Sequence, residues 1–468
     1  MKKYLKLLLS FAVVLLPLSC GDDNEALGDD VTVVMTSQSV AEGAEVDALS
    51  TTEIALYYNM PVQVGSAASI TLNGVRVQAQ RNPRNATGIV IPVQLEEGAS
   101  YTLKLPAGSV VAESNRSATA PELVLNFRTY APRGGNIAQL PLTTNSDAVR
   151  LYRYLYSQYG QKVISSVMAN VNWNNECAEK VFRLTGKYPA MNCYDFIHIC
   201  FSPADWIDYT KLAPVQQWVN NGGLVQLMWH FNVPKTQGST DVTCTPSETT
   251  FRAAKVFEEG SWENQWFYTQ MDKVVATLLK LQEAGIAATW RPFHEAAGNA
   301  TAKQQADWTK SWFWWGYDGA ETYKRLWTTM YDYFQQKGVR NLIWVWTTQN
   351  YNGNSAQYSQ DTAWYPGDQY VDIVARDLYG YTAEQNAQEF NEIQAAYPNK
   401  MVVLGECGQG DGHQPGRIGD GWTKGAKWGL FMVWYQGGEG STDTMCSDDW
   451  WRDAMQDANV ITRDQIKM

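Results

Sequence analysis

Histidine and positive charge are both scarce in this sequence. Its 468 residues include four histidines, and 37 lysine and arginine residues stand against 48 aspartates and glutamates, which leaves a formal net charge of −11. A surface this acidic repels polyphosphate, so no nucleic acid is expected as a partner. A neutral or cationic substrate fits this charge better.

Motifs that bind metals or cofactors are also missing. The histidines are dispersed, and the six cysteines beyond Cys20 contain no C-x-x-C pair of the kind that binds zinc or performs redox chemistry. His294-Glu295 begins like the zinc motif H-E-x-x-H, but Gly298 stands where the second histidine is needed. No G-x-G-x-x-G or Walker loop follows a predicted strand. We therefore expect no metal and no cofactor, while the pairing of the cysteines stays open.

Beyond the first residues, no apolar run approaches the roughly 18 residues of a transmembrane helix. Met1–Ser19 has a basic start and a short apolar core, which predicts a secretion signal. Cys20 and the acidic residues after it resemble a bacterial lipoprotein cleavage site, although Pro17 replaces the usual leucine. This resemblance implies lipidation of Cys20, an acidic tether over 20–30 and a lipid-anchored place on the outer membrane, exposed at the cell surface or facing the periplasm. An ordinary secreted protein, with Cys20 present by chance, is the alternative.

Tryptophan is absent from the first part of the chain, since all 20 lie at or beyond Trp173. Over residues 31–130, short alternating segments separated by turn residues predict an all-β sandwich, which resembles the bacterial immunoglobulin-like domains of surface proteins. A linker is expected over 131–136. The predicted strands are Val31–Met35, Glu53–Tyr58, Ile70–Leu72, Val75–Gln78, Ile89–Val93, Tyr101–Leu105 and Leu123–Phe127.

From residue 137 to 468, apolar strand segments alternate with long helical segments, a pattern typical of a parallel sheet. The expected strands are Val163–Met168, Ala190–Tyr194, Leu224–Trp229, Ala287–Arg291, Leu342–Thr347, Val371–Ala375, Met401–Leu404 and Leu430–Trp434. Helices are expected over Glu263–Ala284, Glu321–Gln336 and Ala383–Ala396. The predicted fold class is therefore α/β, a (β/α)8 TIM barrel preceded by a small all-β immunoglobulin-like sandwich, with an open doubly wound sheet as the alternative to the barrel.

Two of these strands end in a glutamate. Glu295 follows the fourth strand and Glu406 follows the seventh, and the C-terminal ends of barrel strands surround one mouth. Glycoside hydrolysis needs such a pair, one acid that protonates the leaving oxygen and one carboxylate that attacks or activates water. A structural role, such as capping a helix or pairing with a cation, explains one such glutamate more readily than two.

Polar and aromatic residues end other strands. His230 follows the third strand, Asp377 and Tyr379 follow the sixth, and Trp434 ends the eighth. Tyr379 could donate a hydrogen bond to the attacking carboxylate, and Trp434 could form the floor of a sugar site. Residues 312–316 read WFWWG, and because four consecutive aromatic rings cannot all face the core, some should be exposed to the apolar faces of sugars. Plain packing is the alternative for each tryptophan.

At these residues the chain resembles glycoside hydrolase family 26, a family best known for β-mannanases, over about residues 137–460. Its most specific parts are RPFHE at 291–295 and WFWWG at 312–316. The resemblance implies that Glu295 is the acid/base and Glu406 the nucleophile of a retaining mechanism, with carboxyl groups about 5–5.5 Å apart. It further implies a substrate-binding set of His230, Arg291, His294, Trp312, Trp315, Asp377, Tyr379 and Trp434.

The activity implied by the resemblance is that of a retaining endo-β-1,4-mannanase on glucomannan or galactomannan, without a cofactor and as a monomer. The alternatives are an exo-acting, mannobiose-releasing enzyme, a mixed-linkage β-glucanase or xylanase on the same scaffold, and a non-catalytic surface protein that binds glycans. Family members often place the aromatic cluster a few residues after the acid/base glutamate, whereas residues 296–310 intervene here. This spacing looks like a loop inserted at the mouth of the site.

Overall fold

The computed structural model describes residues 32–46, 48, 51–66, 68–83, 85–96, 98–129, 146–170, 173–298, 311–349, 362–437 and 441–468. The predicted signal peptide, Cys20, the tether, the linker and most of the predicted loop 296–310 lie outside these residues. The described residues form two compact units, one that ends at Thr129 and one that holds everything from Ser146 onward. Within the described ranges, no helix has both the length and the apolar character needed to cross a membrane.

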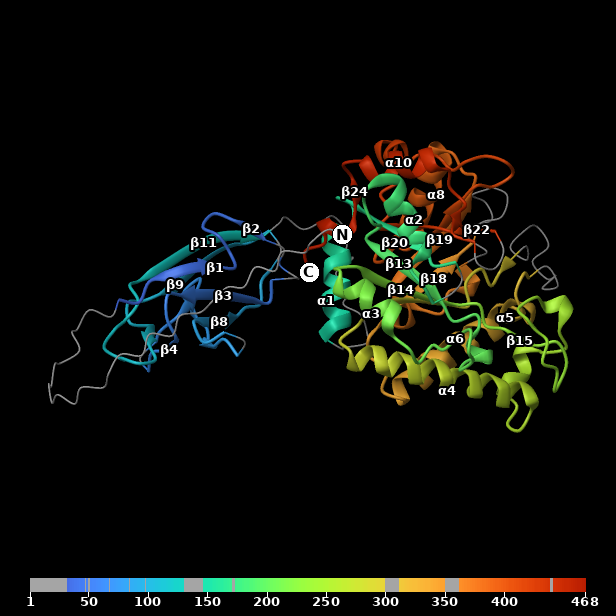
Figure 1. The fold of residues 1–468 in the computed structure, drawn as a ribbon, viewed down its shortest axis with the longest axis horizontal. Helices are drawn as coiled ribbons and strands as arrows, with labels where there is room; N and C mark the ends of the chain where they lie inside the picture. The colour runs from blue at the N-terminus through green and yellow to red at the C-terminus, as the bar shows by residue number, and fades with distance from the viewer. Residues whose placement is uncertain are drawn as a thin grey trace, which may run out of the picture. The chain divides into compact units, whose positions relative to one another are not determined.

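The N-terminal unit is an all-β domain, as predicted (blue to cyan in Figure 1). Its sheets have the orders β1-β3-β8-β7, β10-β4 and β2-β11-β9-β5-β6. The expected strand Val31–Met35 is wrong, because the strand begins at Met35, where it pairs with Tyr58. The likeness to immunoglobulin-like domains stays a prediction. The strands are β1 (Met35–Gln38), β2 (Glu45–Val46), β3 (Glu53–Tyr58), β4 (Val62–Val64), β5 (Thr71–Leu72), β6 (Val75–Arg76), β7 (Gln80–Arg81), β8 (Gly88–Pro92), β9 (Ser100–Leu105), β10 (Val110–Ala112) and β11 (Leu123–Thr129).

Eight parallel strands form a closed barrel in the C-terminal unit (Figure 1). They follow the order β13-β14-β17-β18-β19-β20-β21-β12, and β12 closes the ring by pairing with β13. All eight predicted strands are present, and the closure excludes the open doubly wound sheet. Their bounds are β12 (Val163–Met168), β13 (Met191–Asp195), β14 (Leu224–Trp229), β17 (Ala288–Pro292), β18 (Leu342–Thr348), β19 (Ile373–Tyr379), β20 (Met401–Gly408) and β21 (Leu430–Val433).

Helices surround these strands and cover their outer face (Figure 1). The three predicted helices correspond to α4, α6 and α8, each within a residue or so of its expected ends. The helices are α1 (Ser146–Gln158), α2 (Glu176–Thr185), α3 (Ala213–Asn220), α4 (Trp262–Glu283), α5 (Trp314–Tyr317), α6 (Ala320–Gln336), α8 (Ala383–Ala396), α9 (Ile418–Thr423) and α10 (Asp448–Gln456). The shorter strands of this unit are β15 (Val233–Pro234), β16 (Val242–Thr243), β22 (Tyr435–Gln436), β23 (Asp443–Thr444) and β24 (Val460–Ile461). Its short 3-10 helices are η1 (Ile199–Phe201), η2 (Pro246–Glu248), η3 (Ala253–Phe257), η8 (Thr362–Trp364), η9 (Asp368–Tyr370) and η10 (Arg463–Gln465).

The barrel strands are buried on both faces, which explains why their sequences read as continuous apolar runs. Every residue of β12, β14 and β18 is buried. On the outer side, Trp344 of β18 packs against Trp327 and Phe334 of α6, with ring centroids 5.7 and 5.8 Å apart. This tryptophan therefore belongs to the core between sheet and helix. None of the six described cysteines forms a disulfide bond.

An irregularity in strand pairing sets the geometry at the mouth of the barrel. Arg376 of β19 pairs with Leu404 of β20, but the next residue, Asp377, pairs with Glu406. Gly405 is therefore the extra residue of a β-bulge, a feature that often re-aims side chains beside active sites. The bulge places the Asp377 and Glu406 backbones side by side.

Candidate active site

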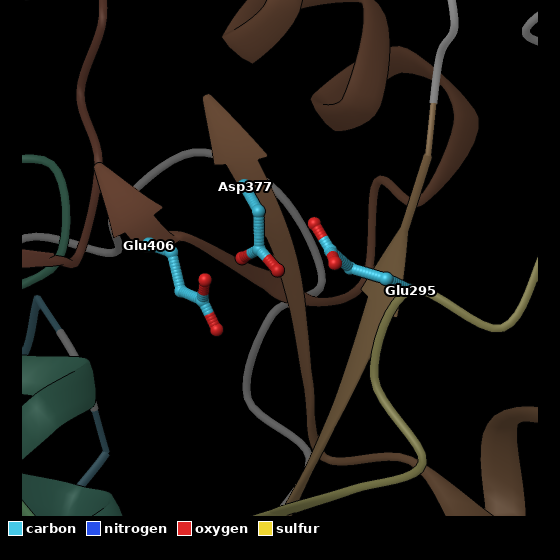
Figure 2. A group of neighbouring side chains, drawn as sticks. All are labelled: Glu295, Asp377 and Glu406. Atoms are coloured by element: carbon cyan, nitrogen blue, oxygen red, sulfur yellow. The ribbon is translucent and has the colours of Figure 1, made fainter. Parts of the chain in front are cut away.

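Three carboxyl groups meet at the C-terminal ends of the barrel strands. Glu295 follows β17, Asp377 lies near the end of β19, and Glu406 lies near the end of β20. Figure 2 shows the Asp377 carboxyl group between the other two, and one oxygen of each group lies within 4.8 Å of an oxygen of both others. The two glutamates expected in one site are thus brought together across 111 residues of sequence, the difference between positions 406 and 295.

A buried arginine lies beneath two of these carboxylates. Arg291 of β17 is fully buried, and its Nη1 donates to Asp377 Oδ2 at 2.9 Å and to Thr347 Oγ1 at 3.1 Å. Its Nη2 donates to Glu406 Oε1. Burial disfavours the charged guanidinium, but the charges of Asp377 and Glu406 outweigh burial and raise the pKa of Arg291. Arg291 therefore stays a cation that partly neutralises the acidic cluster.

Tyr379 engages the other oxygen of Glu406. Its hydroxyl donates to Glu406 Oε2 at 2.6 Å. Burial, and then the charges of Glu406 and Asp377, raise the pKa of Tyr379 well above its ordinary value, so the hydroxyl keeps its proton and acts as a donor. Both oxygens of Glu406 thus receive hydrogen bonds suited to an ionised carboxylate.

Glu295 lies in a different electrostatic environment. Burial, and then the charges of Asp377 and Glu406, raise the pKa of Glu295 well above its ordinary value, despite the opposing effect of Arg291. Burial also raises the pKa of Asp377 to about 7, with Arg291 opposing and Glu406 adding to the shift. Two carboxyl groups whose surroundings favour different protonation states can divide the roles of acid and nucleophile.

The backbone around Glu295 is strained and held in place by its neighbours. Phe293 and Glu295 have φ values of 47° and 50°, in the left-handed region that side chains other than glycine rarely adopt. Trp315 Nε1 donates to the carbonyl of His294 at 2.8 Å, and the Tyr323 hydroxyl donates to that of Phe293 at 3.2 Å. These bonds stabilise the turn that directs Glu295 toward the other carboxyl groups.

Three rings surround His230 at the end of β14. The ring centroid of His230 lies 4.4 Å from His294, 5.7 Å from Trp434 and 5.8 Å from Phe313. His294 is buried, with Nε2 3.9 Å from Glu406 Oε1. Burial lowers the pKa of His294 well below its ordinary value, and the charge that His230 has when protonated and the charge of Arg291 act in the same direction, so this ring is neutral at neutral pH. His294 thus lies beside Glu406, and His230 contacts the rings of both His294 and Trp434.

Two of the predicted substrate-binding residues need correction. Arg291 and Trp315 are both fully buried, so neither offers a surface to a sugar. Arg291 pairs with the carboxylates, and Trp315 packs against Phe313 at 4.4 Å and holds the His294 carbonyl. In the aromatic cluster, Trp312 is the exposed tryptophan, at 38%. The prediction that some of these rings are exposed therefore applies to Trp312.

The sequence reasoning missed Asp195, the last residue of β13. Asp195 is fully buried, and its Oδ2 lies 2.5 Å from His230 Nδ1. The signal was available, because an acidic residue at a strand end is the same feature that identified Glu295 and Glu406. The predicted strand stopped at Tyr194, one residue too early for this acid to be included.

Among the described residues, Glu295, Asp377 and Glu406 form a group close enough to share a metal ion. Arg291 and Tyr379 already bind oxygens of Asp377 and Glu406. A metal ion would have to displace these donors, and the arrangement instead favours proton transfer and nucleophilic attack.

Comparisons with known proteins also indicate a glycoside hydrolase. A sequence model of glycosyl hydrolase family 26 matches residues 142–464. The crystal structure of the GH26 domain of an endo-beta-mannanase/endo-beta-glucanase from Prevotella bryantii has a TM-score of 0.67 and 49% identity, covering 70% of this chain and 99% of that one. A beta-mannanase from a symbiotic protist of the termite Reticulitermes speratus, complexed with gluco-manno-oligosaccharide, has a TM-score of 0.57 and 29% identity, covering 72% and 99%.

Curated relatives share part of their length with this chain. The mannan endo-1,4-beta-mannosidase of Thermothelomyces thermophilus is 29% identical over 347 residues, which are 68% of this chain and 66% of that protein. Mannan endo-1,4-beta-mannosidase A of Piromyces is also 29% identical, over 66% of this chain and 48% of that protein. The chain thus spans between about half and two thirds of these relatives.

Proposed function

Because the chain belongs to glycosyl hydrolase family 26, we propose that it is a retaining endo-β-1,4-mannanase that hydrolyses β-mannans such as glucomannan and galactomannan. The observation that carries the proposal is the pairing of Glu406, bound by Arg291 and Tyr379, with Glu295 at less than 4.8 Å between oxygens. This spacing is close to the roughly 5–5.5 Å of retaining glycosidases and shorter than the roughly 6.5–9.5 Å of inverting ones. The separation therefore favours double displacement over inversion, which needs a wider gap for an attacking water.

In the first step, Glu406 attacks the anomeric carbon of the sugar at the site. Protonated Glu295 donates its proton to the glycosidic oxygen, so the bond to the leaving chain breaks as the glycosyl ester of Glu406 forms. Tyr379 and Arg291 orient the attacking carboxylate. Since Arg291 also binds Asp377, the arginine keeps an anionic partner when the charge of Glu406 is lost in the ester.

In the second step, Glu295 is ionised and acts as the base. It removes a proton from water, which attacks the anomeric carbon on the face vacated by the leaving chain and releases Glu406. Two successive inversions give a product of retained configuration. The nearby negative charges of Asp377 and Glu406, which raise the pKa of Glu295, favour its reprotonation for the next cycle.

The similar proteins support mannan as the substrate. The relatives from Thermothelomyces thermophilus and Piromyces are mannan endo-1,4-beta-mannosidases. The exposed ring of Trp312, beside the segment that carries Glu295, suits stacking on a neutral pyranose. Ser311, its neighbour, donates through Oγ to the carbonyl of Ala296 at 3.0 Å, which ties this exposed ring to the acid/base segment.

The full chain should be incubated with manno-, xylo- and mixed-linkage gluco-oligosaccharides and with galactomannan, and the products followed by NMR. We expect β-anomers to form first, only from mannans, with a mixture of oligosaccharide lengths. Initial α-anomers would refute double displacement, and mannobiose as the sole early product would refute endo action. Cleavage confined to glucan or xylan would refute the mannan assignment, and binding without cleavage would support the non-catalytic alternative.

We also propose that the protein is held to the outer membrane by a lipid on Cys20. The support is the sequence of residues 1–30, with its basic start, apolar core and acidic stretch after Cys20. Expression of wild type and Cys20→Ala in a host that lipidates exported proteins would test the anchor. The wild type should sediment with membranes, whereas equal distribution of the two proteins would refute lipidation.

A further inference from the structure

The Asp195 carboxylate makes three polar contacts, two of which hold one histidine in place. Asp195 Oδ1 accepts hydrogen bonds from the backbone N–H groups of Ile197 at 2.9 Å and His230 at 3.0 Å. Its Oδ2 lies 2.5 Å from His230 Nδ1. The carboxylate is fully buried at the end of β13, so water does not compete for these positions. Both the backbone and the ring of His230 are therefore held by the same side chain.

A carboxylate at this distance decides which ring nitrogen of a neutral histidine carries the proton. It accepts hydrogen bonds and donates none, so Nδ1 must carry hydrogen and Nε2 keeps its lone pair. We propose that Asp195 is a positioning residue that fixes His230 in the Nδ1–H tautomer, so that Nε2 accepts a hydrogen bond from a hydroxyl group of the bound sugar. The sugar in this statement rests on the proposed function, whereas the tautomer does not.

The surroundings of His230 support this role. Its side chain is 12% exposed, although the Nδ1 edge faces a carboxylate with no exposure at all. The exposed part of the ring is thus on the side away from Asp195, where Nε2 lies. The rings of His294, Phe313 and Trp434 surround it at centroid distances of 4.4, 5.8 and 5.7 Å. An acceptor framed by aromatic rings is a combination suited to a sugar, which presents hydroxyl donors and apolar C–H faces.

The variant Asp195→Asn tests the proposal with little structural change. The side-chain oxygen of the introduced asparagine can keep both backbone hydrogen bonds, to the N–H groups of Ile197 and His230. Its NH2 group then faces His230 Nδ1 and can only donate, which moves the ring proton to Nε2. The variant thus converts the nitrogen that faces the site from an acceptor into a donor.

Nitrogen-15 NMR of the histidine rings reads the tautomer directly and without substrate. The chain has four histidines, so the His230 signals can be assigned by their loss in His230→Ala. At a pH where the nitrogen-15 signals show the His230 ring to be neutral, we expect the Nδ1–H form in the wild type and the Nε2–H form in Asp195→Asn. A proton on Nε2 in the wild type, or an unchanged tautomer in the variant, would overturn the proposal.

Kinetics on manno-oligosaccharides give the second readout. We expect Asp195→Asn to lower kcat/KM roughly 10- to 100-fold, the effect of a buried hydrogen-bond partner turned from acceptor to donor. In the His230→Ala background, the same Asp195→Asn change should have no further effect. A full additional loss in that background would show that Asp195 acts on the fold and not through His230, and would overturn the proposal.

A matched control is Asp372→Asn. Asp372 is also buried, and its Oδ2 accepts a hydrogen bond from the backbone N–H of Trp344 at 2.8 Å, which the asparagine oxygen can keep. This variant should leave the His230 tautomer and kcat/KM unchanged.

If the wild type cleaves no mannan but shows the expected tautomers, the proposed substrate is wrong while the role of Asp195 stands.

Discussion

At the scale of single residues, the site shows how neighbours give two glutamates different electrostatic surroundings. Glu406 receives hydrogen bonds from Arg291 and Tyr379, whereas burial and the charges of Asp377 and Glu406 favour the protonated form of Glu295. Asp377 contributes to both environments, because it pairs with Arg291 and faces Glu295. The residue types alone do not distinguish acid from nucleophile, and the surroundings do.

The proposed acid role of Glu295 predicts that the effect of removing its carboxyl group depends on the leaving group of the substrate. Glu295→Gln should lower kcat on mannan by roughly 100- to 10,000-fold, the usual contribution of general acid catalysis. On an aryl β-mannoside whose phenolate leaves without protonation, formation of the glycosyl enzyme should be much less affected. Pre-steady-state release of the phenolate measures this step.

Glu406→Gln is the comparison, because loss of the proposed nucleophile should abolish both the hydrolysis of mannan and the release of the phenolate from the aryl mannoside. Equal losses for Glu295→Gln on the mannan and on the aryl mannoside would contradict the assignment of Glu295 as the acid.

From the charge of Asp377 we predict a shift in the pH dependence of kcat/KM when this residue is replaced. Its negative charge is among the causes that raise the pKa of Glu295, and Glu295 must be protonated to act as the acid. Asp377→Asn removes that charge and leaves Arg291 to act on Glu295, so the pKa of Glu295 should fall. The alkaline limb of kcat/KM should therefore move to lower pH than in the wild type. A limb that stays in place, in a variant whose circular dichroism is unchanged, would show that Asp377 does not set the pKa of the acid.

At the scale of elements, the bulge between β19 and β20 is the feature that aligns the carboxyl groups. Most of the barrel follows from local pattern, and all eight strands and three long helices lie within a few residues of their predicted ends. The bulge could not be predicted in this way, because it depends on the pairing register of two strands and not on the apolar pattern of either one. A glycine at position 405 is visible in the sequence, but the sequence does not show that it lies against Asp377.

The bulge leaves no room for a side chain at Gly405. A Cβ there would lie 2.6 Å from Asp377 Oδ1 and 3.0 Å from Ala375 Cβ. Gly405→Ala should therefore displace Asp377 and lower kcat/KM by roughly 10- to 100-fold, since small displacements of aligned groups are costly in catalysis. Gly421→Ala is the matched control, because its Cβ would meet Ala426 Cβ at an ordinary 3.6 Å. Equal activity of the two variants would mean that the bulge does not constrain the site.

At the scale of the whole molecule, charge and tryptophan are distributed in ways that suit a neutral substrate. The net charge is −11, yet the acidic cluster in the site is balanced in part by a buried arginine. All tryptophans lie in the barrel unit, so intrinsic tryptophan fluorescence reports on that unit and not on the N-terminal β domain.

A neutral polysaccharide should bind without long-range electrostatic attraction. We expect kcat/KM on galactomannan to change less than about twofold between roughly 20 and 300 mM NaCl, because screening affects only the encounter of charged partners. An acidic polysaccharide should bind weakly at low salt, owing to repulsion. A strong fall of kcat/KM with salt would indicate that a charged group of the substrate takes part in recognition.

The sequence by itself determined the barrel strands, the family and the two strand-end glutamates that meet at the mouth of the barrel, because apolar periodicity and strand-end motifs are local and are readable without coordinates. Tertiary structure alone decided that Arg291 and Trp315 support the site from within the core. It also revealed the contact between Asp195 and His230 and the lack of space at Gly405. These features arise when strands distant in the chain pair in one register around a closed barrel, and that register sets the direction in which each side chain points.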